Sequence, residues 1–344
     1  MKKAAIFGAS GYTGAEAVRL LLSHPNVQIA ALSANRRADE AYGDVFANFA
    51  PHELPETRAI EDIDLGDIDV VFSCLPHSTG QGAIAKALEK VETVIDVSAD
   101  FRLSDPSLFE TVYGTPHTQP DLLRDRVYGL TEFARDALPD ARLVACPGCF
   151  PTCALLALLP GVEAGLILDL TIIIDAKTGV TGAGRKATVG LHYSEVSDGA
   201  HAYGVGNHRH APEMDQQLSL SGHSRPVTFT PHLVPMNRGM LATCYVELRE
   251  GVTVNVLRRA YAERYAQDPF VHVLPEGETP QTRHVRGSNE ARIAVCADRV
   301  PGRAIIVSVI DNLTKGSSGQ AVQNYNLTQG WDETLGLTSA GMFP

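Results

Sequence analysis

At 344 residues, the chain is longer than a single hydrophobic core usually fills, and its composition of 44% hydrophobic and 20% charged residues excludes a largely disordered protein. The formal net charge of -11 argues against binding to nucleic acid or to an anionic membrane surface, because both depend on Lys and Arg side chains. No apolar run approaches the roughly 20 residues that span a bilayer, and no signal peptide is recognisable, so a cytoplasmic protein is expected.

The first third of the chain alternates short apolar runs with helical patterns. Strands are expected at residues 3–7, 28–33, 69–74 and 94–97, with helices at residues 15–22 and 80–89. This series predicts a Rossmann-like domain over residues 1–148, built on a parallel sheet. Such sheets bind ligands at the carboxyl ends of their strands.

A glycine-rich turn, "IFGASGYTGAE", follows the first predicted strand and opens the first predicted helix. Glycine there permits a tight turn, lets the backbone approach a pyrophosphate, and lets the helix pack closely on the strand. The spacing is GxxGxxG rather than the commoner GxGxxG, and glycines also occur in many ordinary turns. Its position in the first βα turn nevertheless favours dinucleotide binding. The predicted cofactor contacts in this turn are Gly8, Ser10, Gly11, Tyr12, Thr13 and Gly14.

The second strand leads into "LSANRRADE", where an NAD enzyme usually has Asp or Glu for the ribose hydroxyls. Ser33, Arg36 and Arg37 instead supply a hydroxyl and two guanidinium groups, which suit a 2′-phosphate better. NADP(H) is therefore the predicted cofactor. The alternative, that both arginines are solvated loop charges, stays open.

The stretch "ACPGCFPTCALLALLP", residues 145–160, holds three of the six cysteines. Residues 142–146 predict a strand, and a turn and a helix follow, so Cys149 lies where a helix amino terminus favours a thiolate. A dithiol pair and a structural zinc site are the competing interpretations. A dithiol pair usually lies near the first strand, and a zinc site needs a second ligand pair, whereas Cys244 and Cys296 are isolated. A nucleophilic Cys149 is favoured, with Cys153 facing the interior.

The second half of the chain has strands with few helices between them. Strands are expected at residues 166–176, 226–234, 240–248, 291–299 and 303–311, with helices near residues 252–267 and 315–331. The predicted fold class is α/β, with the Rossmann-like parallel sheet domain followed by an α+β domain with a mixed or antiparallel sheet. That second domain is assigned to residues 149–314, and an open sheet of this kind often pairs with a copy of itself.

Eight blocks in a fixed order give the chain a family resemblance. They are "GASGYTGAE", "CLPHSTGQ", "DVSADFRL", "YGLTE", "PGCFPT", "KTGVTGAGRK", "NHRHAPEM" and "KGSSGQAVQN". The chain resembles the N-acetyl-gamma-glutamyl-phosphate reductase family, NADP-dependent enzymes of arginine biosynthesis that are similar in fold and chemistry to aspartate-semialdehyde dehydrogenases. The resemblance implies reductive dephosphorylation of N-acetylglutamyl 5-phosphate to the semialdehyde, through a thioester on Cys149. It also implies that a C-terminal helix, about residues 315–344, packs back on the first domain.

Histidines of the "HRHAPEM" block are candidates for proton transfer, because the free imidazole titrates near neutrality. The resemblance favours His210 over His208 as the acid/base. A metal site is not predicted, because HxH alone is weak and the family uses no catalytic metal. Further implied cofactor contacts are Leu75, Pro76, His77, Gly182, Gln320 and Asn324, of which His77 and Asn324 could equally be turn and packing residues. The implied substrate-binding residues are Arg102, Glu132, Arg185 and Arg238.

Other functions stay open on the sequence. One is a related acyl-phosphate reductase, either of carrier-linked lysine biosynthesis or similar to aspartate-semialdehyde dehydrogenase; the carrier-linked enzyme would need a basic docking face. Another is a non-catalytic NADP sensor, in which Cys149 is an unreactive thiol. The expected partners are a small-molecule acyl phosphate and further copies of the chain, as a homodimer or homotetramer, with neither nucleic acid nor membrane.

Overall fold

The computed structural model describes residues 1–342, apart from the side chain of Asn35. Two compact units divide the chain, and each is described by itself. The first unit comprises Met1–Gly148 and Ser317–Thr338, and the second comprises Cys149–Gly316 and residues 339–342. In this described part of the chain, no helix has the length and apolarity needed to cross a membrane.

The first unit is built on a seven-stranded, parallel sheet in the order β3-β2-β1-β4-β5-β7-β6. Its strands are β1 (Lys2–Phe7), β2 (Val27–Ser33), β3 (Thr57–Arg58), β4 (Val70–Ser73), β5 (Thr93–Asp96), β6 (Val127–Tyr128) and β7 (Leu143–Ala145). Its helices are α1 (Tyr12–Leu21), α2 (Tyr42–Val45), α3 (Gln81–Leu88), α4 (Pro106–Tyr113), α5 (Thr131–Ala134) and α10 (Gly319–Thr328). The predicted parallel βα domain is confirmed. β3 and β6 were not predicted, because two residues show no periodicity.

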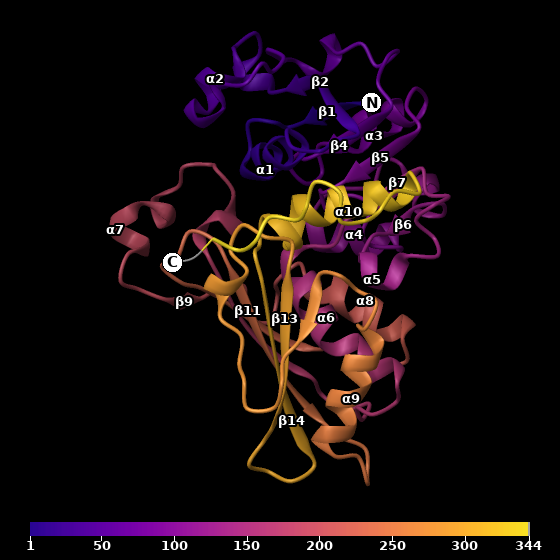
Figure 1. The fold of residues 1–344 in the computed structure, drawn as a ribbon, viewed down its shortest axis with the longest axis vertical. Coiled ribbons are helices and arrows are strands. Elements are labelled where there is room, and N and C mark those ends of the chain that lie inside the picture. The colour runs from indigo at the N-terminus through magenta and orange to yellow at the C-terminus, as the bar shows by residue number, and fades with distance from the viewer. Residues whose placement is uncertain (343–344) are drawn as a thin grey trace. The chain divides into compact units, whose positions relative to one another are not determined.

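The core of the first unit lies around its central strands. Every residue of β4 and β5 is buried, which fits a parallel sheet covered on both faces. α10 contacts α1, α5 and β5, so a segment from the far end of the sequence completes this unit (Figure 1). A hydrophobic cluster of this unit includes Phe7, Val71 and Ile84, and the Tyr325 ring of α10 packs against Phe72 of β4 with ring centroids 5.5 Å apart.

The second unit has a mixed seven-stranded sheet in the order β12-β13-β14-β11-β8-β10-β9, in which β8 runs parallel to β10 and β12 parallel to β13. Its strands are β8 (Ile173–Thr178), β9 (His201–Ala202), β10 (Thr228–Leu233), β11 (Met240–Glu247), β12 (Val271–Val273), β13 (Ala291–Ala297) and β14 (Arg303–Ile310). Its helices are α6 (Cys149–Glu163), α7 (Tyr193–Val196), α8 (Ala211–Leu220) and α9 (Val254–Arg264). The predicted mixed α+β sheet is confirmed.

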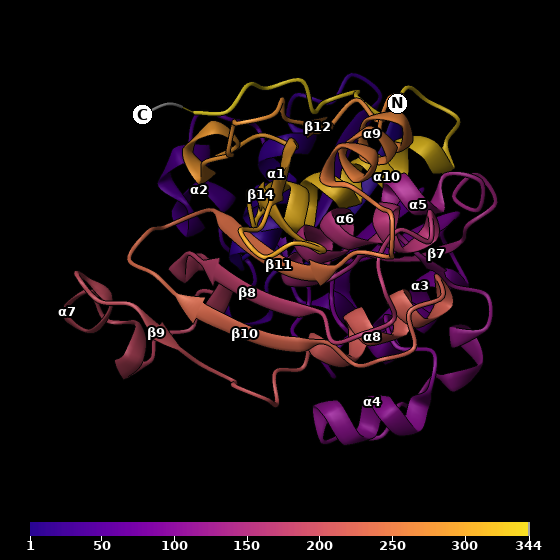
Figure 2. The ribbon, with the colours of Figure 1, turned by 90° about the horizontal axis from the view of Figure 1, so that it is seen from below.

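Helices cover one face of this second sheet. α6 contacts β11 and β14, and α9 contacts β13, so the alternating buried residues of these strands face the helices. β10, β8 and β11 lie side by side, and β9 with α7 extends from their edge (Figure 2). The opposite face keeps partly exposed side chains in register, such as Thr243 opposite Asp175.

One predicted strand begins later than expected. Residues 166–172 were predicted to belong to it, but β8 starts only at Ile173. Ile167 forms a single bridge to Leu248, and its side chain reaches Gly161 of α6, where an added Cβ would lie 2.6 Å from the Ile167 Cδ1. Ile167 therefore packs against α6, and the segment before β8 contributes only this bridge to the sheet.

Candidate active site

The glycine turn after β1 has the geometry of a phosphate-binding turn. Gly8 has a φ of +76°, and an added Cβ there would lie 2.5 Å from the carbonyl oxygen of Cys74. An added Cβ at Gly14 would lie 2.4 Å from the carbonyl oxygen of Gly8, so glycine is needed for close packing of α1. At Gly11, which caps α1, the nearest atom would be 3.5 Å away. The turn therefore leaves space beside Gly11 for the approach of a pyrophosphate, while the Gly11 N–H itself donates to the carbonyl oxygen of Gly8 at 3.1 Å.

Ser33 supports this turn through a hydrogen bond to its backbone. Its side chain is fully buried, and its Oγ accepts a hydrogen bond from the Gly8 N–H at 2.9 Å. The Ser33 hydroxyl thus has a partner within the protein, and its predicted contact with the cofactor stays a prediction. The Tyr42 hydroxyl donates to the carbonyl oxygen of Ala9 at 2.8 Å, which braces the same turn.

The two arginines after β2 differ in their surroundings. Arg36 is exposed. The Arg37 guanidinium donates to the Glu40 carboxylate through Nε at 2.9 Å and Nη2 at 2.6 Å, and this pairing raises the pKa of Arg37. Arg36 is therefore the more available cation of the pair.

Leu75, Pro76 and His77 follow β4, at the same edge of the sheet as the glycine turn. The carbonyl oxygen of Cys74 faces Gly8, which fixes this segment beside the turn. The His77 Nδ1 accepts the Ala99 N–H at 3.1 Å, so this ring also has a structural contact.

Asp100 organises the turn before α3, a role that the sequence did not reveal. Its carboxylate accepts the N–H groups of Ser78 at 2.5 Å and Gly80 at 3.2 Å. Burial, followed by the charge of Asp100, raises the pKa of nearby Asp96 to about 7.

Arg102 is buried in the first unit, where it contacts the chain that leads to Cys149. Its Nε donates to the carbonyl oxygen of Cys146 at 2.8 Å, and its Nη2 to that of Val97, also at 2.8 Å. The guanidinium thus fixes the turn that precedes Cys149. Its predicted contact with the substrate phosphate stays a prediction.

Gln320, Asn324 and Glu132 are buried inside the first unit. The Asn324 amide donates to the carbonyl oxygen of Gly129 at 2.8 Å and accepts the Thr131 hydroxyl at 2.7 Å. Both ends of this amide are used within the protein, which favours the packing role left open for Asn324 over a nicotinamide contact. The Glu132 carboxylate accepts from the Gln323 amide at 3.4 Å, so Glu132 also has a partner inside the unit.

Cys149 is the first residue of α6 and lies in a pocket of about 390 Å³ within the second unit. The thiol is half-buried, whereas Cys153, one turn further along, is fully buried and contacts the carbonyl oxygen of Ser308 at 3.4 Å. Cys153 faces the interior, as expected. Cys149 thus combines access to a pocket with a position at the positive end of a 15-residue helix.

The two predicted histidines line the same pocket as Cys149. The His208 Nδ1 accepts the backbone N–H of His210 at 3.1 Å, which leaves the ring proton on Nε2. Burial, and then the positive charge of Arg209, lowers the pKa of His208 to about 4. His208 is therefore neutral near pH 7. His210 is the N-cap residue of α8, and its ring lies 4.9 Å from that of His208.

An aromatic cluster, which was not predicted from the sequence, surrounds these rings. Phe150, Phe229 and Tyr203 each pack edge-on against His208, with ring centroids 5.6, 5.3 and 5.6 Å away. Burial, followed by the charge of Cys149, raises the pKa of Tyr203, so this phenol stays protonated beside the thiol. Its position in "HAYGVGNHRH", five residues before His208, was the available signal.

The remaining predicted residues of the second unit lie in different surroundings. Gly182 lines the Cys149 pocket. Arg185 is exposed on the segment before α7. Arg238 forms a bidentate ion pair with buried Asp311, with both distances 2.9 Å. Contact of Arg185 or Arg238 with substrate stays a prediction, and for Arg238 the ion pair already accounts for the guanidinium.

Metal and disulfide chemistry were the alternatives considered for the cysteines. Within residues 1–342, no three His, Cys, Asp or Glu side chains come together as a metal site would require. None of the six cysteines, all of them in the described part of the chain, forms a disulfide. Cys149 shares its pocket with His208 and His210, an arrangement that suits a nucleophilic cysteine, and this role stays a prediction.

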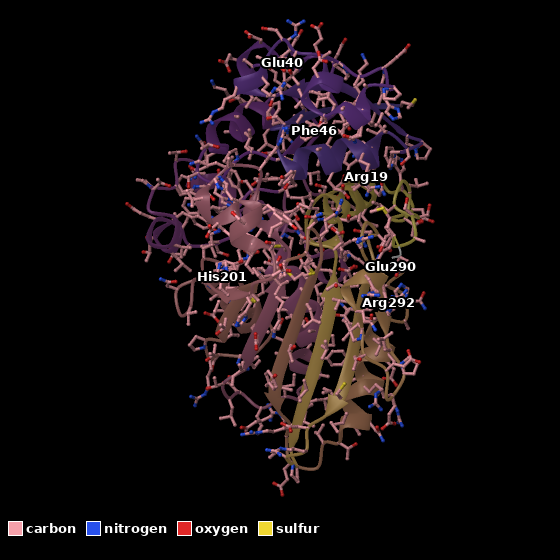
Figure 3. All side chains as sticks on the ribbon, turned by 90° about the vertical axis from the view of Figure 1, so that its left-hand side faces the viewer. Arg19, Glu40, Phe46, His201, Glu290 and Arg292 are labelled. Carbon is pink, nitrogen blue, oxygen red and sulfur yellow. The ribbon has the colours of Figure 1, made fainter. Side chains whose placement is uncertain are left out.

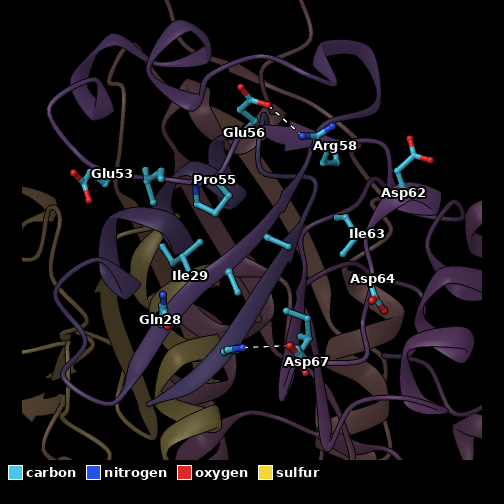
Figure 4. Close-up of a pocket in the computed structure, with 15 residues that line it drawn as sticks. Gln28, Ile29, Glu53, Pro55, Glu56, Arg58, Asp62, Ile63, Asp64 and Asp67 are labelled. Atoms are coloured by element: carbon cyan, nitrogen blue, oxygen red, sulfur yellow. Dashed lines mark hydrogen bonds and ion pairs between the residues drawn. The ribbon is translucent and has the colours of Figure 1, made fainter.

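A larger hollow of about 930 Å³ lies within the first unit. Its lining includes Lys3 of β1 and Gln28 of β2. Acidic side chains, among them Asp62 and Asp64, also line it (Figure 4). Its lining includes neither a cysteine nor a histidine. The predicted chemistry therefore does not reside there.

Comparison with known families defines the class of the protein. The model described as "Semialdehyde dehydrogenase, NAD binding domain" matches residues 3–141, and "Semialdehyde dehydrogenase, dimerisation domain" matches residues 149–312. Among solved structures, aspartate semialdehyde dehydrogenase II from Vibrio cholerae superimposes with a TM-score of 0.72 at 18% identity, covering 96% of this chain and 99% of that one. Aspartate semialdehyde dehydrogenase with NADP from Candida albicans gives a TM-score of 0.71 at 17% identity, covering 96% and 98%. At these identities the structures establish the semialdehyde dehydrogenase fold.

Curated relatives show which family within this class the chain matches. The N-acetyl-gamma-glutamyl-phosphate reductase of Afipia carboxidovorans is 55% identical over 341 residues, covering 98% of this chain and 97% of the relative. The enzyme of the same name from Rhodospirillum rubrum is 53% identical over 345 residues, covering 99% and 98%. The chain belongs to the N-acetyl-gamma-glutamyl-phosphate reductase family, and the resemblance found in its sequence is confirmed.

Proposed function

We propose that the protein catalyses the NADPH-dependent reductive dephosphorylation of N-acetyl-L-glutamyl 5-phosphate to N-acetyl-L-glutamate 5-semialdehyde and phosphate, in the cytoplasm. The observation that supports this most directly is Cys149, at the start of α6, in one pocket with His208, Arg209 and His210. Relatives covering nearly the whole chain have the name of this enzyme. The glycine turn of the first unit suits a dinucleotide, because the nearest atom to an added Cβ at Gly11 would be 3.5 Å away, which leaves space for a phosphate.

Cys149 is the nucleophile in this proposal. Its sulfur forms a bond to the acyl carbon while the bond from that carbon to phosphate breaks, leaving a thioester and inorganic phosphate. The first-turn N–H groups of an α-helix have no acceptor within the helix, so those at the start of α6 can stabilise the oxyanion. Arg209, exposed at the pocket, supplies a positive charge for the anionic substrate.

A bound reduced nicotinamide supplies the hydride that reduces the thioester. The resulting alkoxide re-forms a carbonyl as the carbon–sulfur bond breaks, and the departing sulfur takes a proton from His210. The released phosphate takes its own proton from solvent. Since the pKa of His208 is about 4, that ring is neutral near pH 7, and its remaining Nε2–H is a far weaker acid than an imidazolium, which favours His210 in this role.

The preference for NADP over NAD rests on the loop after β2. The exposed guanidinium of Arg36 is the group best suited to a 2′-phosphate, because Arg37 is bound by Glu40. The Candida albicans neighbour, of the same fold, is described with NADP. Arg36 is therefore proposed as the main source of the preference.

Replacing Arg36 with alanine is expected to raise the KM for NADPH by about tenfold or more, the effect of losing one charge-assisted hydrogen bond. The KM for NADH should change little, because NADH lacks the 2′-phosphate. Steady-state kinetics with both cofactors provide the measurement. Arg37→Ala is the matched control, with a smaller expected effect. Equal losses with NADH and NADPH would exclude the proposed contact.

A homodimer is proposed through the open face of the second sheet. The matching family model is described as a dimerisation domain, and this face presents Tyr245 and Ile173, 39% and 45% exposed. Arg292 of β13 lies on the same face, beside its partner Glu290 at 3.1 Å (Figure 3). A mixed apolar and charged face of this kind suits pairing with a second copy.

Tyr245→Arg is expected to convert the dimer into monomers, because the interface would then have to bury an unpaired charge. Sedimentation velocity on both proteins gives the masses directly. Tyr193→Arg is the control, since Tyr193 is 85% exposed and belongs to α7, outside this sheet face. A wild-type protein that sediments as a monomer at micromolar concentration would contradict the assignment.

The activity itself is tested in the reverse direction, where the aldehyde is stable. N-acetylglutamate 5-semialdehyde, phosphate and NADP should give NADPH, with absorbance at the nicotinamide band as the readout. Omitting phosphate should abolish turnover, because phosphate is the nucleophile that takes the acyl group from the thioester and releases Cys149. Faster turnover of the non-acetylated or shorter semialdehyde would indicate one of the related acyl-phosphate reductases instead.

A further inference from the structure

Gly316 lies against the proposed nucleophile. An added Cβ at this position would be 2.9 Å from the Cys149 Cβ, 3.1 Å from the Ile310 Cδ1 and 3.3 Å from the carbonyl oxygen of Asp311. Its φ is outside the positive range in which glycine is favoured for conformational reasons. A side chain at position 316 would collide with Cys149. Glycine is therefore required here because there is no space for a larger residue.

The backbone at Gly316 has an unusual conformation. Residues 314–318 form a π-helical turn directly before α10. The Gly316 N–H donates to the carbonyl oxygen of Asp311, five residues earlier, at 2.9 Å. Turns of this type are rare and occur mostly at functional sites, because they move a backbone segment out of the regular helical path.

A buried carboxylate holds the turn in place. Both oxygens of Asp311 are used: Oδ1 accepts the N–H groups of Leu313 and Thr314 at 2.8 and 3.0 Å, and Oδ2 accepts that of Gly287 at 2.7 Å. Arg238 adds its bidentate ion pair and donates to the Thr314 hydroxyl at 2.9 Å. A fully buried carboxylate with this many partners, paired with a partly buried guanidinium, fixes a single geometry.

We propose that the π-helical turn at residues 314–318, clamped by Asp311 and Arg238, positions the Cys149 side chain through the bare backbone of Gly316. The turn forms the wall against which the Cβ of Cys149 rests, so it determines where the sulfur points at the start of α6. Gly316, Asp311 and Arg238 are positioning residues, because each acts through Cys149. This assignment gives Arg238 a role other than contact with substrate, and it rests on the proposed role of Cys149 as nucleophile.

Gly316→Ala is the principal test. An added methyl must displace Cys149, and a displacement of about 1 Å in a reacting group costs on the order of 100-fold in rate. We expect kcat to fall by about that factor while the KM for NADP changes little, and the rate of alkylation of Cys149 by iodoacetamide to fall, with a displaced pH profile. Gly82→Ala is the control, because an added Cβ in α3 would meet nothing within 4 Å.

Ile310→Val distinguishes positioning from general packing. In the double variant with Gly316→Ala, the Cδ1 atom of residue 310 is absent, so a defect caused by that neighbour would be relieved. Persistence of the kinetic defect supports contact with Cys149, and restoration of wild-type rates overturns the proposal. So does a Gly316→Ala protein that alkylates and turns over like Gly82→Ala.

Arg238→Gln keeps the proposal testable should Gly316→Ala fail to fold. This substitution removes the ion pair with Asp311 without adding an atom near the thiol. We expect alkylation of Cys149 to slow by several-fold. An unchanged alkylation rate overturns the proposal. Alkylation needs no substrate, so it reports on the turn even where the semialdehyde assay fails. A wild-type protein with a reactive Cys149 but no semialdehyde turnover would refute the proposed function alone.

Discussion

Replacing Cys149 with serine is expected to lower kcat by at least about 10³-fold in the semialdehyde assay, without a change in cofactor affinity. A serine hydroxyl has a pKa far above that of a thiol, so even a helix amino terminus cannot ionise it near pH 7. The thioester then cannot form, and neither phosphate release nor aldehyde formation proceeds. Turnover of the semialdehyde with phosphate and NADP provides the measurement.

A matched control for this variant is Cys296→Ser in β13. Cys296 is also partly exposed, and burial raises the pKa of its thiol, so it should be neither nucleophilic nor essential. Wild-type activity of Cys296→Ser beside inactive Cys149→Ser assigns the chemistry to one sulfur. A Cys149→Ser protein with a substantial fraction of wild-type turnover would instead support a nucleotide-binding role without thioester chemistry.

Replacing His210 with asparagine is expected to lower kcat by about 10²- to 10⁴-fold, the range associated with loss of general acid and base catalysis. Asparagine preserves a polar group at the start of α8 but cannot exchange a proton near neutrality. Because the proton step follows thioester formation, alkylation of Cys149 should be affected less than turnover. Comparison of the two rates in one preparation provides the measurement.

His208→Asn is the control for His210→Asn. The asparagine oxygen can replace Nδ1 as acceptor of the His210 N–H, so the local backbone should be retained. Since the pKa of His208 is about 4, its ring stays neutral from pH 6 to 9, and the pH profile over that range should be that of the wild type. A profile that loses its acidic limb in His208→Asn would transfer the acid/base role to that residue.

Local patterns in the sequence determined most of the first unit. Apolar runs of strand length, glycine spacing and helical periodicity are properties of neighbouring residues, so β1, β2, β4, β5 and the glycine turn could be predicted. Cys149 at a helix start was readable for the same reason, because a strand, a turn with Pro and Gly, and a long apolar helix follow one another there.

Tertiary contacts decided what the candidate residues do. Ser33 and Asn324 have the chemistry of ligand contacts, and in the structure both are buried and bond to Gly8 and to Gly129. Arg238 has the charge for a substrate anion but is bound to Asp311.

The division between sequence and structure has a physical cause. Propensity and periodicity act over a few residues, whereas the partner of a polar side chain is selected by which distant segments pack beside it. The sequence by itself therefore determined the family, the longer strands and helices, and the types of residue available for chemistry. Only the tertiary structure decided that Gly316 meets Cys149, and that the Nδ1 of His208 accepts the backbone N–H of His210 while burial lowers the pKa of the His208 ring.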